Sequence, residues 1–398
     1  MPEQQIMSNF PLLVPADFTG ALNVRYDEGE GAIPLSVADM DFQAPTQVVG
    51  AVVARAAQGA YGYTYVPQTL VSAVANWFET RHGWSMNPDA VIATGRVVEA
   101  IPTLLALLTN PADPVVVPSP SYHPITAAVE ANGRRLVTAP MTRADGCYVL
   151  DLDAVREGLT QPTSSRPLLI LTNPHNPTGR VFAKSELREL AGVAEECGAL
   201  IISDDVHADI LYPEHKYTPI CTVSEYAEEN TITFLSPGKT FNLAGLESTI
   251  VLVDNKELFV KVETALRAAG FHNPAYFAVV ATQAAYEHGA PWLDQFLSLI
   301  DQNLQTMLAF IEAQDLNIKV IKPEGTYLVW MDLGQIGDEK TVQAALKDAG
   351  LVLSPGSGFG AGNERFARMN LATTPDNFNK ALTRLALACK TAQKNPSK

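Results

Sequence analysis

Residues 168–180 read LLILTNPHNPTGR, and this stretch decides the fold. Its first half is a continuous apolar run, which is typical of a strand buried on both faces, as in a parallel sheet. Its second half is a loop with Asn-Pro steps at Asn173 and Asn176, followed by Gly179. Asn, Pro and Gly are turn residues, so a turn explains one Asn-Pro step. A second step so close to the end of a core strand favours a loop with a functional role.

The same texture, a short apolar run followed by a helical pattern, repeats from about residue 90 to residue 255. We predict strands at 90–94, 114–117, 136–139, 168–172, 200–203, 231–235 and 249–253. We predict helices between them at 97–108, 122–131 and 184–197. Strands that alternate with helices in this way indicate an α/β fold. The prediction is a large domain with a mostly parallel seven-stranded sheet covered by helices.

The pattern changes after about residue 290, where a smaller α+β domain is predicted. A long helix is expected at 291–313, then strands at 318–321, 327–331 and 367–371, and helices at 342–349 and from Pro375 onward. The polar tail after Thr391 is expected to fray. The expected division has three parts: an N-terminal segment, 1–50, that packs with the small domain, a large domain, 51–289, and a small C-terminal domain, 290–398.

The composition excludes several classes of protein. Of the 398 residues, 47% are hydrophobic and 18% are charged, which is typical of globular chains. The net charge of −15 disfavours binding to nucleic acid or to anionic membrane surfaces. The four cysteines form no C-x-x-C pair, so we expect no disulfide framework and no bound metal. Residues 1–20 do not resemble a secretory signal, and no apolar run is long enough to span a bilayer, so we expect a cytoplasmic protein.

Ligands of open α/β sheets collect at the carboxyl ends of the strands, which directs attention to Asp204. This residue follows the apolar run at 199–202. A carboxylate in that place either caps the next helix or holds a protonated ring nitrogen. Pyridoxal 5′-phosphate (PLP) needs such a proton, because it makes the pyridine ring an electron sink.

Lys239 follows the apolar run at 231–235 in the sequence SPGKTFN. Most lysines are solvated surface charges. A lysine placed after a core strand and a Pro-Gly turn can lose its charge by desolvation and act as an amine nucleophile. It would form the Schiff base with PLP, and Ser236 is close enough in sequence to reach the phosphate.

Three further segments carry weaker signals. Gly95 begins a predicted helix, where backbone N–H groups could cradle a phosphate, although many helices begin this way. Tyr122 follows another strand and is either a core residue or a ring that stacks on a cofactor. Arg368 lies within an apolar strand, and its planar fork would bind either an internal carboxylate or that of a substrate.

Together these segments resemble the fold type I PLP-dependent enzymes of the aspartate aminotransferase superfamily. Within that superfamily, the chain resembles the MalY/PatB group of cystathionine β-lyases, or C–S lyases, from about Ile33 to Cys389. The resemblance is carried by residues 34–42, 61–63, 173–179, 203–207, 236–242, 323–330 and 354–370. The VADMDF stretch and the NPHNPTG loop are specific in combination, whereas a single short motif carries a real risk of a false match.

The resemblance implies roles for individual residues. Lys239 would bear PLP and act as the acid and base, and Asp204 would pair with the pyridinium nitrogen. The other implied contacts to the cofactor are Asn176 and His207 near the phenolic oxygen, Tyr122 stacked on the ring, and Ser236 with the backbone of Arg96 and Val97 at the phosphate. Tyr63 would reach the phosphate of a neighbouring subunit, which implies a homodimer with shared active sites. Arg368 and Asn176 would bind the α-carboxylate of an amino-acid substrate.

Two positions depart from the pattern of the group. The group usually has Pro-Gly or Pro-Ser where this chain has Gly95-Arg96, so Arg96 either adds a charge beside the phosphate or points outward. The usual Asp-Glu pair is Asp204-Asp205 here. This change retains Asp204, and Asp205 is expected to be structural.

The implied activity is that of a PLP-dependent carbon–sulfur lyase. It would cleave cystathionine, or a related cysteine S-conjugate, by β-elimination to a thiol such as homocysteine, pyruvate and ammonia, a step toward methionine. An aminotransferase is the alternative enzyme, because both reactions begin by removing the Cα proton. An alternative of another class is a regulatory role through a partner protein, beside or instead of catalysis.

Overall fold

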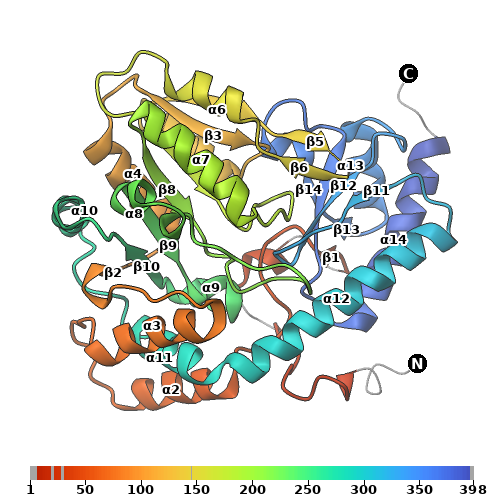
Figure 1. Cartoon of the computed structure of the whole chain (residues 1–398). Coiled ribbons are helices and arrows are strands. Elements are labelled where there is room, and N and C mark those ends of the chain that lie inside the picture. Colours follow the sequence, from red (N-terminus) through yellow and green to blue (C-terminus); the bar gives the residue numbers. More distant parts are fainter. Residues whose placement is uncertain (1–6, 19–21, 28–30, 145, 395–398) are drawn as a thin grey trace.

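The structure is a computed structural model that describes residues 7–18, 22–27, 31–144 and 146–394. Its centre is a seven-stranded sheet with the strand order β2-β10-β9-β8-β7-β3-β4 (Figure 1). The strands are β2 (Val91–Thr94), β3 (Pro114–Ser119), β4 (Arg135–Pro140), β7 (Leu168–Thr172), β8 (Leu200–Asp204), β9 (Thr231–Leu235) and β10 (Thr249–Leu252). Strand β10 runs in the direction opposite to the other six, so its pairings with β2 and β9 are antiparallel and the remaining pairings are parallel. The predicted mostly parallel sheet of an α/β fold is confirmed.

Helices cover both faces of this sheet, as the continuous apolar strands require. Successive strand residues point to opposite faces, so Val115 and Val117 pack with one group of helices and Val116 packs with the other. The first group is α4 (Val97–Leu108), α5 (His123–Ala131) and α10 (Lys256–Ala268). The second group is α6 (Leu152–Leu159), α7 (Lys184–Cys197) and α8 (Glu225–Asn230). The sheet is therefore the middle layer of three.

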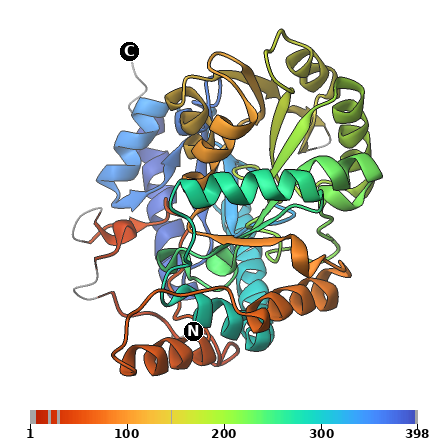
Figure 2. The same cartoon turned by 90° about the vertical axis from the view of Figure 1, so that its left-hand side faces the viewer.

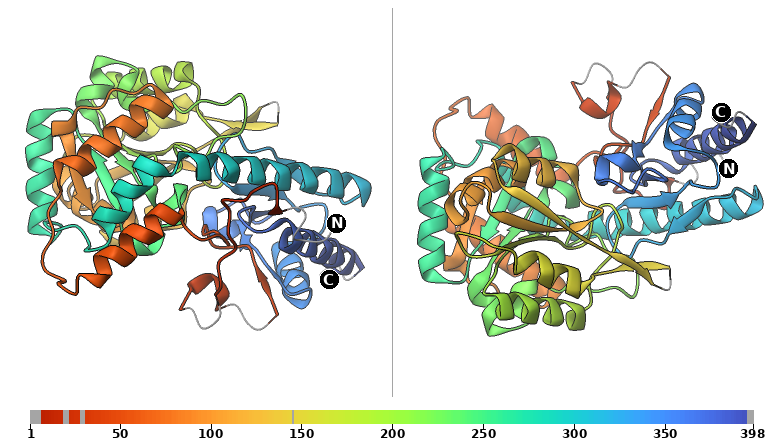
Figure 3. Two further views of the ribbon diagram at one scale, coloured as in Figure 1. Left: turned by 90° about the horizontal axis from the view of Figure 1, so that it is seen from below. Right: turned by 90° about the horizontal axis from the view of Figure 1, so that it is seen from above.

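The C-terminal part holds a four-stranded antiparallel sheet with the order β11-β12-β15-β14. Its strands are β11 (Lys319–Ile321), β12 (Leu328–Asp332), β14 (Ser354–Pro355) and β15 (Phe366–Asn370). The helices here are α12 (Ala290–Ala313), α13 (Glu339–Asp348) and α14 (Pro375–Lys394). Helix α12 is 24 residues long and runs from the side of the large sheet to that of the small one (Figure 3).

The N-terminal segment lies against the C-terminal part (Figure 2). Strand β1 (Ile33–Pro34) pairs in parallel with β13 (Leu351–Val352). After it, the chain reaches α2 (Thr46–Ala57) and α3 (Gln68–His82), which pack with α11 (Ala278–His288). The domain limits at residues 50 and 289 stay a prediction.

The remaining elements are short. They are the hairpin strands β5 (Thr142–Ala144) and β6 (Cys147–Val149), the single-turn helix α9 (Pro237–Thr240), and the 3₁₀ helices η1 (Val24–Tyr26), η2 (Pro88–Ala90), η3 (Ile220–Thr222), η4 (Ala244–Leu246) and η5 (Gly356–Phe359). Within the described ranges, no helix combines the length and the apolar character that crossing a bilayer requires.

Two predicted boundaries were wrong for physical reasons. Helix α13 begins at Glu339, before the predicted start at Val342, because the side chain of Asp338 caps it and accepts a hydrogen bond from the Thr341 amide. Helix α14 continues to Lys394 instead of fraying after Thr391. Ala392 is buried there, so the last turn is held by packing that its polar neighbours conceal in the sequence.

Candidate active site

Asp204 and Lys239 follow neighbouring strands of the large sheet. Asp204 is the last residue of β8, and it pairs with Thr172 of β7 on one side and with Phe234 of β9 on the other. Lys239 lies in α9, directly after β9. Because the carboxyl ends of parallel strands meet at one edge, the sheet brings together two residues that are 35 positions apart in sequence.

The short helix α9 fixes the position of Lys239. Ser236 begins the helix, and its Oγ accepts a hydrogen bond from the Gly238 amide at 3.0 Å. The Lys239 Nζ donates to the carbonyl oxygen of Ala38 at 2.7 Å. Burial is the main cause that lowers the pKa of Lys239, and the positive charge of Arg368 acts in the same direction, while Asp39 and Asp204 oppose the shift. The amine is therefore easier to deprotonate than that of an ordinary lysine.

The carboxylate of Asp204 is buried with one oxygen free. The residue is 5% exposed, and its Oδ1 has no hydrogen-bond partner among the residues described. Burial raises the pKa of Asp204 to about 6, although the Val206 amide and the charge of Lys239 act in the opposite direction. A buried acceptor without a partner costs free energy, so a ligand that donates a hydrogen bond to Oδ1 would be stabilised here.

Arg368 reaches the same place from β15 of the small sheet. Its guanidinium donates to Asn176 Oδ1 at 2.9 Å and to the Ser36 carbonyl oxygen at 2.7 Å, and it lies 4.9 Å from the centre of the Phe359 ring. It is 5% exposed, and burial lowers its pKa to about 10. It forms no ion pair with any described residue, and its Nε has no partner. A buried cation in this state favours an anionic ligand.

His207 and Tyr122 complete the ionisable groups at this edge of the sheet. His207 is 2% exposed, and its Nδ1 lacks a partner within the described chain. Burial, together with the charges of Lys239 and Arg368, holds the pKa of His207 well below its usual range, so its ring is neutral at pH 7. Burial raises the pKa of the Tyr122 hydroxyl, with Arg368 opposing the shift and Asp204 adding to it. We call Lys239, Asp204, His207, Asn176, Tyr122 and Arg368 the Lys239 site.

The predicted phosphate-binding residues lie together at the end of the same sheet. Ser236 Oγ donates to the Ser248 carbonyl oxygen at 2.6 Å. Arg96 begins α4, directly before Val97, and its side chain forms an ion pair with Glu247. In the described conformation the Arg96 side chain therefore has a carboxylate partner from this chain.

Tyr63 and Asp205 lie in very different surroundings in the single chain. The structure does not bring Tyr63 to the Lys239 site, because its side chain is 96% exposed. Asp205 accepts hydrogen bonds from the hydroxyls of Ser203 and Tyr217 and has the structural surroundings that we expected.

Sequence reasoning missed the backbone of residues 36–39, which lies across the Lys239 site. The Ala38 carbonyl oxygen accepts from Tyr327 Oη at 3.0 Å as well as from Lys239. The Asn370 Nδ2 donates to the carbonyl oxygens of Val37 and Asp39. Backbone carbonyls have no signature in the sequence, although the VADMDF motif marked their position.

The residues present fit PLP. The free Asp204 Oδ1 matches a protonated ring nitrogen, the Lys239 amine matches an aldehyde, and the unpaired cation of Arg368 matches the carboxylate of an amino acid. The neutral His207 supplies a further free ring nitrogen.

Comparison with known proteins identifies the family. Residues 30–385 match the family described as aminotransferase class I and II. The chain belongs to this family. It is 35% identical to cystathionine beta-lyase PatB of Bacillus subtilis, over 91% of this chain and 96% of that protein. It is 27% identical to protein MalY of Escherichia coli, over 89% and 90% of the two chains. The resemblance noted in the sequence is confirmed.

Solved structures of similar proteins have the same fold. Cystalysin from Treponema denticola, which contains PLP, superimposes with a TM-score of 0.91 at 27% identity, covering 95% of this chain and 98% of that one. The PLP-bound C-S lyase from Staphylococcus hominis has a TM-score of 0.83 at 29% identity, covering 94% and 98%. Both relatives carry the cofactor that the geometry of the Lys239 site fits.

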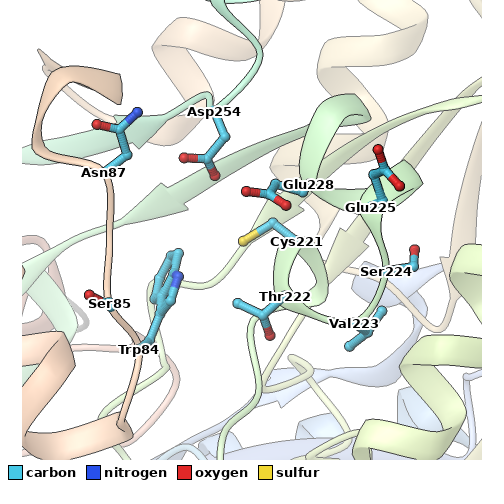
Figure 4. Close-up of a pocket in the computed structure, with 10 residues that line it drawn as sticks. All are labelled: Trp84, Ser85, Asn87, Cys221, Thr222, Val223, Ser224, Glu225, Glu228 and Asp254. Atoms are coloured by element: carbon cyan, nitrogen blue, oxygen red, sulfur yellow. The ribbon is translucent and has the colours of Figure 1, made fainter.

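A separate pocket of about 470 Å³ shares no residue with the Lys239 site (Figure 4). It is lined by Trp84, Ser85, Asn87, Cys221, Thr222, Val223, Ser224, Glu225, Glu228 and Asp254, and we call it the acidic pocket. The side chains of Asp254, Glu228 and Cys221 face one another in Figure 4. Burial, with repulsion from Glu228 and Glu229, raises the pKa of Asp254 to about 6.

Proposed function

We propose that the chain is a PLP-dependent C–S β-lyase that cleaves cystathionine or a related cysteine S-conjugate to a thiol, pyruvate and ammonia. The observation that carries PLP chemistry on an amino acid is the Lys239 site, where an easily deprotonated amine, a carboxylate with a free oxygen and an unpaired guanidinium meet. The choice of a lyase rests on similarity to PatB, MalY and the C-S lyase from Staphylococcus hominis.

Arg368 would hold the substrate. Its free Nε and its terminal nitrogens present the planar fork that binds a carboxylate in two places. The Asn176 amide already touches this guanidinium and would orient the same carboxylate. Fixing the α-carboxylate sets the direction of the Cα–H bond, and such alignment accounts for a large part of the rate in reactions of this kind.

Lys239 would move the protons. With its lowered pKa, the Lys239 Nζ would accept the Cα proton of a substrate held by Arg368. PLP supplies the electron sink for the charge that develops at Cα. The Asp204 carboxylate would keep the ring nitrogen protonated, and its burial strengthens that interaction. The Cβ–S bond would then break with its electron pair on sulfur, and the proton that Lys239 took from Cα would pass to that sulfur to give the thiol.

Tyr63 supports the proposal that the active form is a homodimer. An aromatic ring that is 96% exposed in the single chain is unusual, and Tyr61 and Tyr65 beside it are 64% and 76% exposed. We propose that Tyr63 reaches the cofactor phosphate of a second copy. A cytoplasmic location and a role in methionine synthesis stay predictions.

The test is a pair of assays on one purified sample with added PLP. Cystathionine is supplied and pyruvate is measured with a coupled dehydrogenase, while exchange between an amino acid and a keto acid is measured in parallel. We expect pyruvate to form faster than the amino group is exchanged. Amino-group exchange without pyruvate would identify an aminotransferase instead. Inactivity in both assays, with PLP bound, would favour the regulatory alternative.

A further inference from the structure

Arg96 is bound on two sides by carboxylates of this chain. Its Nη2 lies 2.7 Å from Glu247 Oε1, and its Nη1 lies 3.8 Å from Glu99 Oε1. The Arg96 side chain is 51% exposed, so none of these groups is deeply buried. An exposed ion pair of this kind contributes little to stability and can exchange partners readily.

The strand register places these groups beside Ser236. Thr94 of β2 pairs with Thr249 of β10, and Ile250 pairs with Leu235 of β9. Gly95 and Arg96 follow β2, Glu247 and Ser248 precede β10, and Ser236 follows β9, so all of them lie at one end of the sheet. The hydrogen bond from Ser236 Oγ to the Ser248 carbonyl oxygen confirms that two of these segments touch.

Glu99 occupies the start of α4, where an anion is stabilised most. Its Oε2 accepts a hydrogen bond from the Arg96 amide at 3.1 Å. The same oxygen lies so close to Gly95 that a Cβ at that residue would be 2.6 Å from it. Thr94, the last residue of β2, is 4% exposed. Its hydroxyl has no hydrogen-bond partner in the described chain. At this end of the sheet the Glu99 carboxylate therefore binds the Arg96 amide, and the Thr94 hydroxyl is left without an acceptor.

We propose that the side chain of Arg96 binds the cofactor phosphate and that Glu99 and Glu247 compete with the phosphate for it. In the described conformation Glu99 takes the backbone amide and Glu247 takes the guanidinium. A phosphate dianion would displace Glu247 from the guanidinium, because it carries more charge than one carboxylate and accepts from several donors at once, while the nearby negative charge of Glu99 opposes its binding. This inference rests on the proposed PLP function, and it makes Arg96 and Glu99 determinants of cofactor affinity.

The competing explanation is that Glu99 only caps the helix. A glutamate at the third position of a helix often binds the amide of the first flanking residue. Glutamine does so equally well but has no charge. Glu99→Gln therefore keeps the hydrogen bond to the Arg96 amide and removes only the negative charge that opposes the phosphate, which separates the two explanations.

The experiment measures binding without catalysis. Lys239→Ala is used as the background, so that affinity reports non-covalent binding, and dissociation constants are measured by quenching of tryptophan fluorescence. The probes are PLP and pyridoxal, which differ only by the phosphate. With Glu99→Gln we expect PLP to bind about three- to tenfold more tightly, from loss of one nearby charge, with no change for pyridoxal. With Arg96→Ala we expect PLP to bind about tenfold more weakly, again without an effect on pyridoxal.

Asp153→Asn is the matched control, because Asp153 is an exposed acid in the first turn of α6, a helix that packs with β3 and β4. Thermal unfolding without ligand checks that each variant folds. Equal effects on PLP and pyridoxal, or a PLP affinity that either Glu99→Gln or Arg96→Ala leaves unchanged, would overturn the proposal. These results differ from failure of the proposed function, in which the chain with Lys239 present would not bind PLP at all.

Discussion

The Lys239 site and the acidic pocket differ in how their polar groups are satisfied. In the Lys239 site, Asp204 Oδ1, His207 Nδ1 and Arg368 Nε are buried and have no partner within the described residues. In the acidic pocket, Glu225 and Glu228 are exposed and water can solvate them. The acidic pocket encloses about 470 Å³, yet none of its lining residues has a buried side-chain polar atom without a partner within the described residues.

This difference shows that unsatisfied burial indicates a ligand better than the size of a cavity does. A buried polar atom without a partner costs about 1–3 kcal/mol, and a fold that retains several of them at one place is completed by a ligand. The acidic pocket carries a mutual repulsion that a proton on Asp254 relieves, so no ligand is needed to explain it. Changes in the first region should affect chemistry, whereas changes in the second should affect only stability.

The largest expected effect is that of Lys239→Ala. The substitution removes the amine that binds the cofactor and moves the Cα proton, so we expect the rate of pyruvate release to fall by more than about a thousandfold. The purified wild type should show an absorbance band that borohydride reduction traps on Lys239, and the variant should not. Lys184→Ala, at the exposed start of α7, is the control. Wild-type activity in the Lys239 variant would remove the site from the reaction.

Asp204→Asn should have the next largest effect. A neutral amide does not favour the proton on the ring nitrogen, so we expect kcat for elimination to fall by about a hundredfold or more. Binding of PLP should weaken less than kcat falls, because Lys239 still holds the cofactor. Asp205→Asn is the comparison, since its carboxylate is satisfied by Ser203 and Tyr217. We expect Asp205→Asn to lower the free energy of unfolding more than it lowers kcat. An Asp204 variant with normal kcat would contradict the assignment.

Arg368→Ala should weaken binding of the α-carboxylate. Loss of a buried charged partner typically costs about 2–5 kcal/mol, which corresponds to about thirtyfold or more in kcat/KM. We expect KM to rise more than kcat falls. An amine analogue of the substrate, which lacks the α-carboxylate, should react equally poorly with wild type and variant. Arg365→Ala is the matched control, because Arg365 lies just before the same strand but is half exposed and pairs with Asp332. Equal effects of the two substitutions would reject a specific role for Arg368.

Sequence reasoning located the groups that follow core strands and failed for groups placed by long-range contacts. Asp204 and Lys239 could be predicted because the apolar runs before them define where parallel strands end. The partner of Arg96 could not, since Glu247 is 151 positions away in sequence and reaches it only through the pairing of β2 with β10. The backbone oxygen of Ala38 is equally hidden, because any residue there would supply it.

The smallest expected effect tests the acidic pocket. The pKa of Asp254 is raised in the folded state to about 6 from an ordinary value of 3.8, so the folded protein binds this proton more tightly than the unfolded chain does. Its favourable contribution is therefore present below about pH 4 and is lost as the pH rises through 6.

Asp254→Asn should accordingly stabilise the fold above pH 6, by less than about 1 kcal/mol because solvent screens this partly exposed group. The gain should shrink as the pH falls toward 4.5. Urea unfolding at pH 4.5 and pH 8 measures both values, and Glu225→Gln, which removes a more exposed charge of the same pocket, should give no gain at pH 8. If Asp254→Asn instead lowered stability at pH 8 and changed the rate of pyruvate release, the carboxylate would hold a ligand, and the contrast between the two regions would fail.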